Sequence, residues 1–265
     1  MGIKERRTKI LVSLLLLSDV KFDYVSLNRT LQRAFDLSLN QKTKGTLSGM
    51  IREQLIEKQE GVVTSAQNPQ PQSLDMQSRS NEVKYKLTEK GFHELSLEFP
   101  FFRFLRDKWD SKWRVLSYEI PEKKRELRDK LRREVTGWGL GPWHRSFWLT
   151  PHPIIDNLRL LVSQKEEEQY IQAFESQHSF GNREVLIEKV WQKSILEKKY
   201  RELFKKWHNI LSGENDKVDK FKTVIGEYVE VLRSDPGLPP ELVGESWIGF
   251  EAFNIFKEIR TILLS

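Results

Sequence analysis

Apolar residues recur at helical spacing in three segments near the start of the chain. The segments cover residues 6–17, 24–35 and 41–53, and in each the apolar side chains gather on one face of a helix. Leu47 and Met50 mark that face in the third segment, which leaves lysines and small polar residues on its other faces. We therefore predict three helices, each with one buried face.

Beyond the third helix the pattern changes from helical to alternating. Residues 59–81 are rich in Gln, Ser, Asn and Pro and contain too little apolar content to pack, which predicts a mobile loop. Three apolar residues then alternate with Lys84 and Lys86, as in a half-buried strand. Three helices followed by a long basic hairpin are the element order of a winged helix-turn-helix, whose third helix enters the major groove of DNA. We assign residues 1–95 to such a domain, with 59–81 as its wing loop.

The rest of the chain predicts a connecting segment, a sheet and a set of helices. Residues 96–110 read as a connecting helix so rich in aromatic side chains that we expect an interface there. Residues 111–180 give a strand, a helix, a strand at 144–151, a helix and a strand, which is the skeleton of a ferredoxin-like sheet with helices on one face. Residues 181–265 carry long helical patterns at 183–211, 216–233 and 249–264. The predicted fold class is α+β, with a winged helix-turn-helix, a central ferredoxin-like domain of βαββαβ type and a C-terminal helical domain.

A basic helix follows the first strand of the predicted sheet, after Pro121. Its apolar residues Leu127, Leu131 and Val135 recur every four positions, which places them on one face that we expect to be buried. A second row of lysine and arginine side chains stays in water. We interpret this helix first as scaffold, with the basic row as an additional candidate for contact with DNA or with a second subunit.

Composition limits the classes of function that remain open. The 265 residues are 31% charged and 38% hydrophobic, a balance typical of a globular protein. The net charge is +6 and 38 residues are acidic, so any basic footprint for a polyanion must be local. Absence of cysteine excludes disulfides, thiolate metal sites and cysteine nucleophiles, and favours the cytoplasm. The apolar run after the basic N-terminus is shorter than the ~20 residues that cross a bilayer, and no cleavage site follows it, so we expect no contact with a membrane.

Candidate DNA-binding side chains follow from the winged helix-turn-helix assignment. Lysine and arginine neutralise phosphates and donate to guanine, and hydroxyl groups contact bases or phosphates. For an isolated helix the alternative is a solvated face. The candidates are Lys42, Lys44, Thr46, Ser48 and Arg52 on the third helix, and Arg79, Lys84 and Lys86 on the hairpin.

Two further kinds of site are weighed on the central segment. Glu119, at the end of the first strand, is a carboxylate of the kind that binds Mg²⁺, but no second acidic residue accompanies it on the strand. The five histidines show no metal-ligand spacing. An effector pocket has four candidate lining residues, and packing of the sheet against its neighbours is the alternative for each of them. These residues are Trp143, His144, Arg145 and Trp148.

The segment "WRVLSYEIPEKKRELRDKLRREVTGWGLGPWHRSFWLTPHP" carries a family resemblance. It resembles the central core of the PaaX-like transcriptional regulators, a family named for the repressor of phenylacetic acid degradation. "TLSGMIREQLIEK" with "VKYKLTEKG" is similar to its winged-helix domain, and "WQKSILEKKYREL" with "RSDPGLPPELVGESWIG" to its C-terminal region. The chain departs from the family pattern in the recognition helix, where Lys44 and Gly49 replace arginines and Gln54 replaces a closing glycine.

The resemblance implies a repressor that acts as a homodimer on double-stranded DNA, with an acyl-CoA effector in the best-known members. It also implies a central domain similar to the small CRISPR-associated endonucleases, in which Glu119 occupies the slot of a metal-binding Asp. We therefore predict a sequence-specific regulator on a roughly palindromic operator, with no catalytic step and no cofactor. The alternative is a metal-dependent nuclease or a CRISPR-adaptation-like component.

Overall fold

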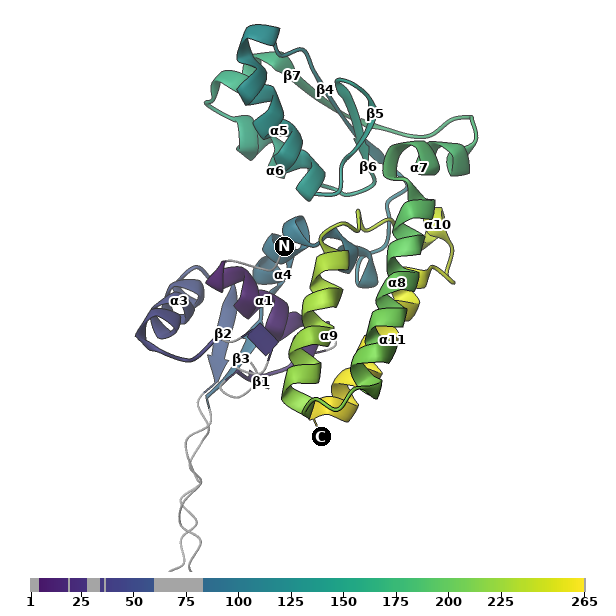
Figure 1. Ribbon diagram of the computed structural model, residues 1–265. Coiled ribbons are helices and arrows are strands. Elements are labelled where there is room, and N and C mark those ends of the chain that lie inside the picture. Colours follow the sequence, from purple (N-terminus) through teal and green to yellow (C-terminus); the bar gives the residue numbers. More distant parts are fainter. Residues whose placement is uncertain (1–4, 19, 28–33, 36, 60–82, 265) are drawn as a thin grey trace, which may run out of the picture. The chain divides into compact units, whose positions relative to one another are not determined.

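The computed structural model describes residues 5–18, 20–27, 34–35, 37–59 and 83–264. The fold is α+β, and the chain divides into two compact units with the break between Leu95 and Ser96. Figure 1 shows the elements of both units along the sequence. Each unit is described by itself.

The first unit combines helices with a small antiparallel sheet. It contains α1 (Arg6–Leu17), β1 (Val25–Ser26), α3 (Gln41–Arg52), β2 (Ile56–Gln59), β3 (Lys84–Leu87) and the start of α4 (Glu89–Glu98). The strands lie in the order β1-β3-β2. The buried residues of α1 face several directions, including the fully buried Ile10, Leu14 and Leu15, and the helix packs against both α3 and β3. The predicted first and third helices are confirmed to within one residue.

The prediction of one helix over residues 24–35 is wrong at its start. Val25 and Ser26 are extended and pair with Tyr85 and Lys84 of β3, which satisfies their backbone groups in a sheet. Helical structure is present at residues 34–35, whereas 28–33 and 36 lie outside the described residues. Gln59, which we placed in the loop, pairs with Lys84 at the end of β2. The remainder of the predicted wing loop, 60–81, also lies outside the described residues.

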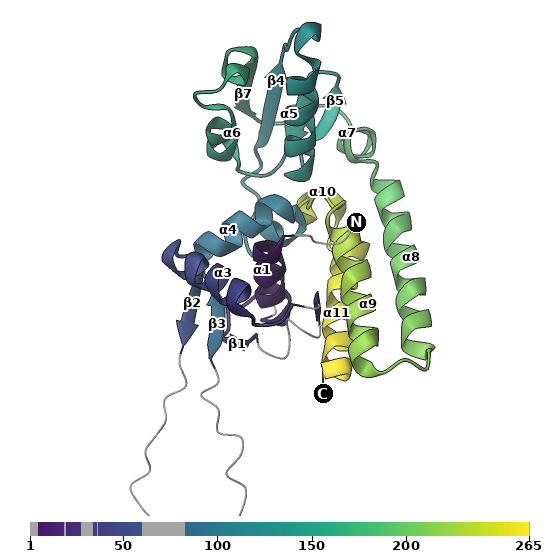
Figure 2. The ribbon, with the colours of Figure 1, turned by 60° about the vertical axis from the view of Figure 1, so that its left-hand side comes forward.

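The second unit begins with a four-stranded antiparallel sheet. Its elements are β4 (Trp113–Tyr118), α5 (Arg125–Gly137), β5 (Gly141–His144), β6 (Phe147–Thr150), α6 (Ile155–Val162) and β7 (Ile171–Ser176). Short 3-10 helices at Glu122–Lys124 and Glu166–Tyr170 connect some of them, and a further one at Pro100–Leu105 precedes β4. The strand order is β5-β6-β4-β7, so β5 and β7 form the two edges, as Figure 2 shows. The single strand predicted over 144–151 is instead a hairpin, because the chain turns at Arg145 and Ser146.

The two faces of this sheet have separate apolar clusters. Leu116 and Trp148 pack with Leu131 and Val135 of α5 and with Leu158 of α6. This confirms the predicted inward face of the basic helix. On the opposite face lies a second cluster, made up of Phe104, Trp109, Trp113, Val115, Leu149 and Val190.

The C-terminal part of the second unit is helical. It contains α7 (Arg183–Trp191), α8 (Lys193–Ser212), α9 (Lys217–Leu232), α10 (Pro240–Val243) and α11 (Ile248–Leu264). The predicted helix 183–211 is interrupted, because Gln192 adopts a left-handed conformation with φ 52°. The Glu188 carboxylate accepts hydrogen bonds from the backbone N–H and hydroxyl of Ser194 at 3.0 and 2.5 Å, which stabilises the start of α8.

The aromatic side chains of residues 96–110 pack against other residues of the same chain. Phe101 and Phe102 are 2% and 0% exposed, and both rings contact the ring of Phe253 in α11. Trp109 is also buried and meets Trp113 edge-on. The structure thus places in an internal core the side chains that we expected at an interface.

Candidate nucleic-acid interface

Local hydrogen bonds determine where α3 begins. The side-chain oxygen of Asn40 accepts the backbone N–H of Thr43 at 3.0 Å, which caps the first turn. The hydroxyl of Thr43 donates to the carbonyl of Ser38 at 2.8 Å, and this side chain is fully buried. The N-terminal half of α3 is therefore held firmly to the preceding segment.

The buried and exposed residues of α3 lie on separate faces. Thr43, Leu47 and Met50 are buried, and Leu55 after the helix is buried with them. Ile51, which we expected to face inward, is half-buried. The exposed residues include four of the sequence-predicted DNA-binding side chains, namely Lys42, Lys44, Ser48 and Arg52.

Thr46 and Ser48 use their hydroxyl protons within the helix. Thr46 Oγ1 donates to the carbonyl of Lys42 and Ser48 Oγ to that of Lys44, both at 3.0 Å. Thr46 is half-buried. The hydroxyl oxygen of the exposed Ser48 can still accept a hydrogen bond, so this residue suits an amino group of a base better than a phosphate.

Two glycines on α3 are a feature that our sequence reasoning did not use. A Cβ atom added to Gly45 or to Gly49 would meet nothing within 4 Å. Packing inside the chain therefore does not require glycine at either position. Gly45 is exposed and directly follows Lys44 in sequence, so the helix backbone is accessible at that point.

The end of α3 is fixed by an unusual turn and by ion pairs. Gln54 has a left-handed φ of 61°, a conformation that favours glycine, at the position where the family pattern has glycine. The guanidinium of Arg7 in α1 forms ion pairs at 2.7 Å with both Glu53 and Glu94. These contacts tie α1 to the turn that follows α3.

The lysines of β3 differ in their surroundings. Lys84 is exposed. Lys86 pairs with Glu57 at 2.8 Å and lies 5.1 Å from the centre of the Tyr24 ring, and the hydrogen bond with Glu57 raises the pKa of Lys86. Lys84 is thus the better placed of the two for contact with a phosphate. The third hairpin candidate, Arg79, lies outside the described residues.

The four effector candidates do not share one surface. Trp148 is 5% exposed, packs against α5 and α6, and donates its indole N–H to Tyr118 at 3.2 Å. The ring of Trp143 contacts that of Phe147, whose side chain packs on the face of the sheet opposite to Trp148. Trp143 is 45% exposed, and the ammonium of Lys189 lies over its ring. His144 and Arg145 are exposed at the hairpin turn.

Glu119 is exposed at the end of β4, where its backbone N–H donates to the carbonyl of Tyr170 at 2.9 Å. Within the described part of the chain, no group of three or more histidine or carboxylate side chains is placed to hold a metal ion. The residues present at Glu119 therefore do not fit the multi-ligand site that a metal-dependent nuclease uses.

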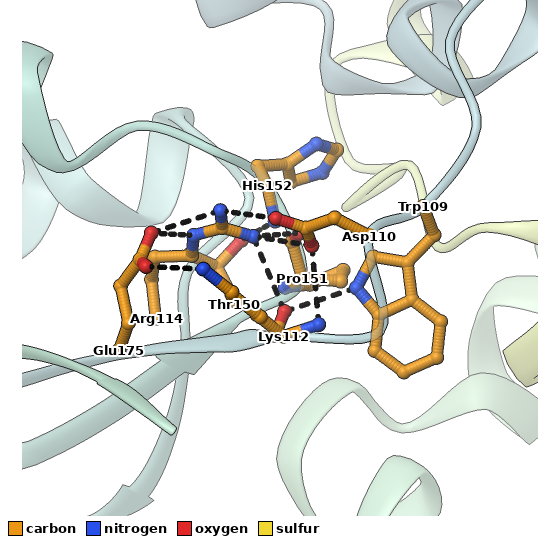
Figure 3. A network of polar contacts seen from close by, with 8 residues as sticks. All are labelled: Trp109, Asp110, Lys112, Arg114, Thr150, Pro151, His152 and Glu175. Carbon is orange, nitrogen blue, oxygen red and sulfur yellow. Dashed lines mark hydrogen bonds and ion pairs between the residues drawn. The ribbon is translucent and has the colours of Figure 1, made fainter. Parts of the chain in front are cut away.

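A polar network that the sequence did not predict lies at the start of β4 (Figure 3). The guanidinium of Arg114, 3% exposed, binds both oxygens of Asp110 at 2.8 and 2.6 Å and Glu175 of β7 at 3.0 Å. Burial lowers the pKa of the adjacent His152 to about 3, so its ring is neutral. Its Nε2 donates to the carbonyl of Pro236 at 2.7 Å. These contacts join the sheet to the loop between α9 and α10.

Comparison with known families identifies the chain. The PaaX protein central Cas2-like domain matches residues 106–186, and the PaaX-like protein C-terminal domain matches residues 191–265. The chain belongs to the PaaX-like family. The resemblance read from the motifs is thereby confirmed, and the family matches indicate a transcription regulator.

Comparisons with curated proteins and with solved structures add no functional information. No curated protein matches the chain. The solved structure of the uncharacterized protein Rv0674 from Mycobacterium tuberculosis is similar, with 16% sequence identity, 97% coverage of each chain and a TM-score of 0.46. No helix among the described residues is long and apolar enough to cross a membrane.

Proposed function

We propose that this PaaX-like protein is a sequence-specific DNA-binding repressor that acts as a homodimer on a roughly palindromic operator. The observation that carries the proposal is the exposed face of α3. Lys42, Lys44, Ser48 and Arg52 lie on it, while the opposite face is anchored by Leu47 and Met50. A helix held firmly on one side and cationic on the other can enter the major groove without unfolding its own core.

The element order of the first unit supports a winged helix-turn-helix. α1 is followed by the short strand β1, by α3 and then by β2 and β3, and β3 lies between the other two strands. The exposed Lys84 sits at the N-terminal end of β3, next to the segment we assign to the wing. In this arrangement α3 reads base edges and the wing contacts the adjacent phosphates.

The strand order of the second unit supports a ferredoxin-like central domain. Numbered within the domain, β4, β5, β6 and β7 are the first to fourth strands, and the observed order is second, third, first, fourth. α5 follows the first strand and α6 the third, and both pack on the same face. This is the arrangement that the βαββαβ pattern predicts.

The mechanism is occupancy of the operator. Two winged domains bind half-sites in successive major grooves, and the second unit of each chain links the two chains into one dimer. An acyl-CoA effector that releases DNA remains part of the proposal. Of the four residues considered for its site, Trp143, His144 and Arg145 are exposed and stay part of the proposal, whereas Trp148 packs in the core between the sheet and α5 and α6.

Two single variants test the interface. An operator is first obtained by capture of genomic DNA fragments with the purified protein. Lys44→Ala should then weaken binding to the operator by about 1–3 kcal/mol and narrow the gap between operator and random DNA, as loss of a base contact does. Lys84→Ala should weaken binding to all sequences alike and flatten the salt dependence by about one unit of slope, as loss of a phosphate contact does.

Lys205→Ala on α8 is the matched control, because Lys205 is an exposed lysine in the second unit. It should leave both measurements unchanged. A folded Lys42/Lys44/Ser48 triple alanine variant that binds the operator as tightly as the parent would exclude α3 as the recognition helix.

A further inference from the structure

The edge strand β7 is exposed along almost its whole length. It lies at one end of the sheet order, paired on its inner side with β4 from Trp113 to Tyr118. Every residue from Gln172 to Ser176 is exposed, and Phe174 is 53% exposed although its partner Val115 is buried. Among the described residues, no strand pairs with the outer edge of β7.

The opposite edge of the same sheet is protected. β5 contains Pro142, which has no N–H to offer, and an irregularity in the ladder between Pro142 and His144. α7 also covers it, since a Cβ atom on Gly141 would lie 2.3 Å from Val190 and 2.6 Å from Trp191. Proline, a bulge and a covering helix are the devices by which proteins prevent strands from adding to a sheet edge.

None of these devices is present on β7. Its sequence, IQAFES, contains no proline and no lysine, and its register with β4 is regular over six residue pairs. A regular, uncovered edge that exposes a phenylalanine is a template for another strand. The contrast between the two edges of one sheet indicates that β7 is built to be paired.

We propose that β7 pairs antiparallel with β7 of a second copy of this chain, so that two sheets become one. An antiparallel ladder between identical strands is two-fold symmetric by construction. The proposal rests on the proposed function, which requires a two-fold dimer, and it assigns the interface of that dimer to the central domain. Charge is compatible with it, because Glu175 is already compensated by Lys112 and Arg114 of its own chain.

Symmetry restricts the register of this pairing. Directly opposite residues of an antiparallel pair have side chains on the same face, so the two-fold axis must pass through a residue facing its own copy. A centre at Glu175 opposes two carboxylates, and a centre at Gln172 leaves little overlap. Of the centres at Ala173 and Phe174, the second places two exposed aromatic rings opposite each other, which is a favourable cross-strand pair. Phe174 therefore faces Phe174 of the second copy.

Charge substitution at this position tests the pairing in the full-length protein. Light scattering should give twice the mass of one chain for the parent and the mass of one chain for Phe174→Lys and for Phe174→Glu, because each places like charges opposite one another. An equimolar mixture of the two variants should regain the dimer mass. Leu160→Lys, at an apolar residue of α6 that is 75% exposed, is the control and should remain dimeric.

Disulfide trapping gives a second, independent test, because the chain has no cysteine of its own. Phe174→Cys should cross-link two chains on mild oxidation, since opposed Cβ atoms lie about 4.5–5.5 Å apart. Ala173→Cys, at a residue that is also exposed but would face Glu175 of the second copy, should cross-link far less. The proposal is overturned if the parent is a monomer at micromolar concentration. It is also overturned if Phe174→Lys keeps the mass of the parent and Phe174→Cys does not cross-link. In either case the edge of β7 would be left to a strand of another protein.

DNA binding separates this inference from the proposed function. Phe174→Lys should bind a full operator about 100-fold more weakly than the parent while its affinity for a half-site is unchanged, because only the linkage of two heads is lost. Efficient cross-linking at Phe174 in a protein that binds no specific DNA would refute the proposed function and leave the dimer interface standing.

Discussion

Replacing Gly45 with alanine separates the stability of α3 from its use in binding. Gly45 lies in the interior of the helix, is exposed, and has no atom within 4 Å of an added Cβ. The substitution therefore introduces no clash inside the chain. Its only effect on folding comes from the helix propensity of the residue and from the smaller conformational freedom of the unfolded chain.

The expected gain in stability follows from that geometry. Alanine in an exposed helix interior is more favourable than glycine by about 1 kcal/mol. Gly45→Ala should thus increase the free energy of unfolding of the first unit by about this amount. If α3 lies in the major groove, the added methyl group keeps the backbone away from DNA, and operator affinity should fall by about 1–3 kcal/mol, the range of a disturbed base contact.

Gly226→Ala provides a matched control in α9. Gly226 is also exposed, lies inside a helix and has no atom within 4 Å of an added Cβ. This variant should gain about 1 kcal/mol in the second unit and bind DNA like the parent. Hydrogen exchange at increasing urea concentration measures the free energy of unfolding of each unit. Fluorescence titration with the operator measures the affinity of each variant for DNA.

The result that refutes the reasoning is specific. A Gly45→Ala protein that is more stable and still binds the operator as tightly as the parent shows that DNA does not approach this face of α3. A Gly45→Ala variant that is less stable than the parent shows instead that other atoms occupy the space beside Gly45 in solution, so that the added methyl group clashes with them.

Three further outcomes are expected. Burial raises the pKa of Asp235 to about 6 from an ordinary 3.8, so its protonated form favours the folded state and the stability it contributes is lost as pH rises through 6. The parent should therefore lose about 2 kcal/mol between pH 4 and pH 7 relative to Asp235→Asn, measured by urea unfolding at each pH, and parallel pH profiles would contradict this. Gly139→Ala should destabilise the second unit by about 2 kcal/mol or more, because Gly139 has φ 86° and an added Cβ would lie 2.6 Å from the Pro236 carbonyl; an unchanged thermal midpoint would show that the loop can move aside. Purified protein with Mg²⁺ should cut neither DNA nor RNA, and cleavage that disappears in Glu119→Gln would establish the nuclease alternative.

Sequence periodicity determined those helices whose buried face follows from the spacing of their own apolar residues. The spacing of Leu47 and Met50 placed α3 correctly, and that of Leu131 and Val135 gave the inward face of α5, because the buried face of an amphipathic helix repeats every 3.6 residues. The motifs also led to the family, which the two domain matches confirm. They did so because loops and strand ends with special geometry, such as the segment around His152, require particular local sequences.

The local pattern of residues did not predict those ends of helices and strands that depend on contacts with segments distant in sequence. β1 was read as part of a helix because residues 24–35 have helical spacing, whereas its pairing with Tyr85 depends on a strand some 60 residues away. The break at Gln192 was hidden in the same way, since Glu188 and Ser194 both fit a continuous helix until their side chains are seen to cap a new one.

Only the tertiary structure decided which apolar side chains remain available to a partner. Phe101 and Phe102 looked like interface residues but are buried against Phe253, while Phe174 drew no attention and is half exposed at a sheet edge. The physical reason is that a sequence states how much apolar surface a segment carries, whereas burial depends on which other segments cover it. That coverage is set by strand order and by the packing of α7 and α11, which no local pattern of residues contains.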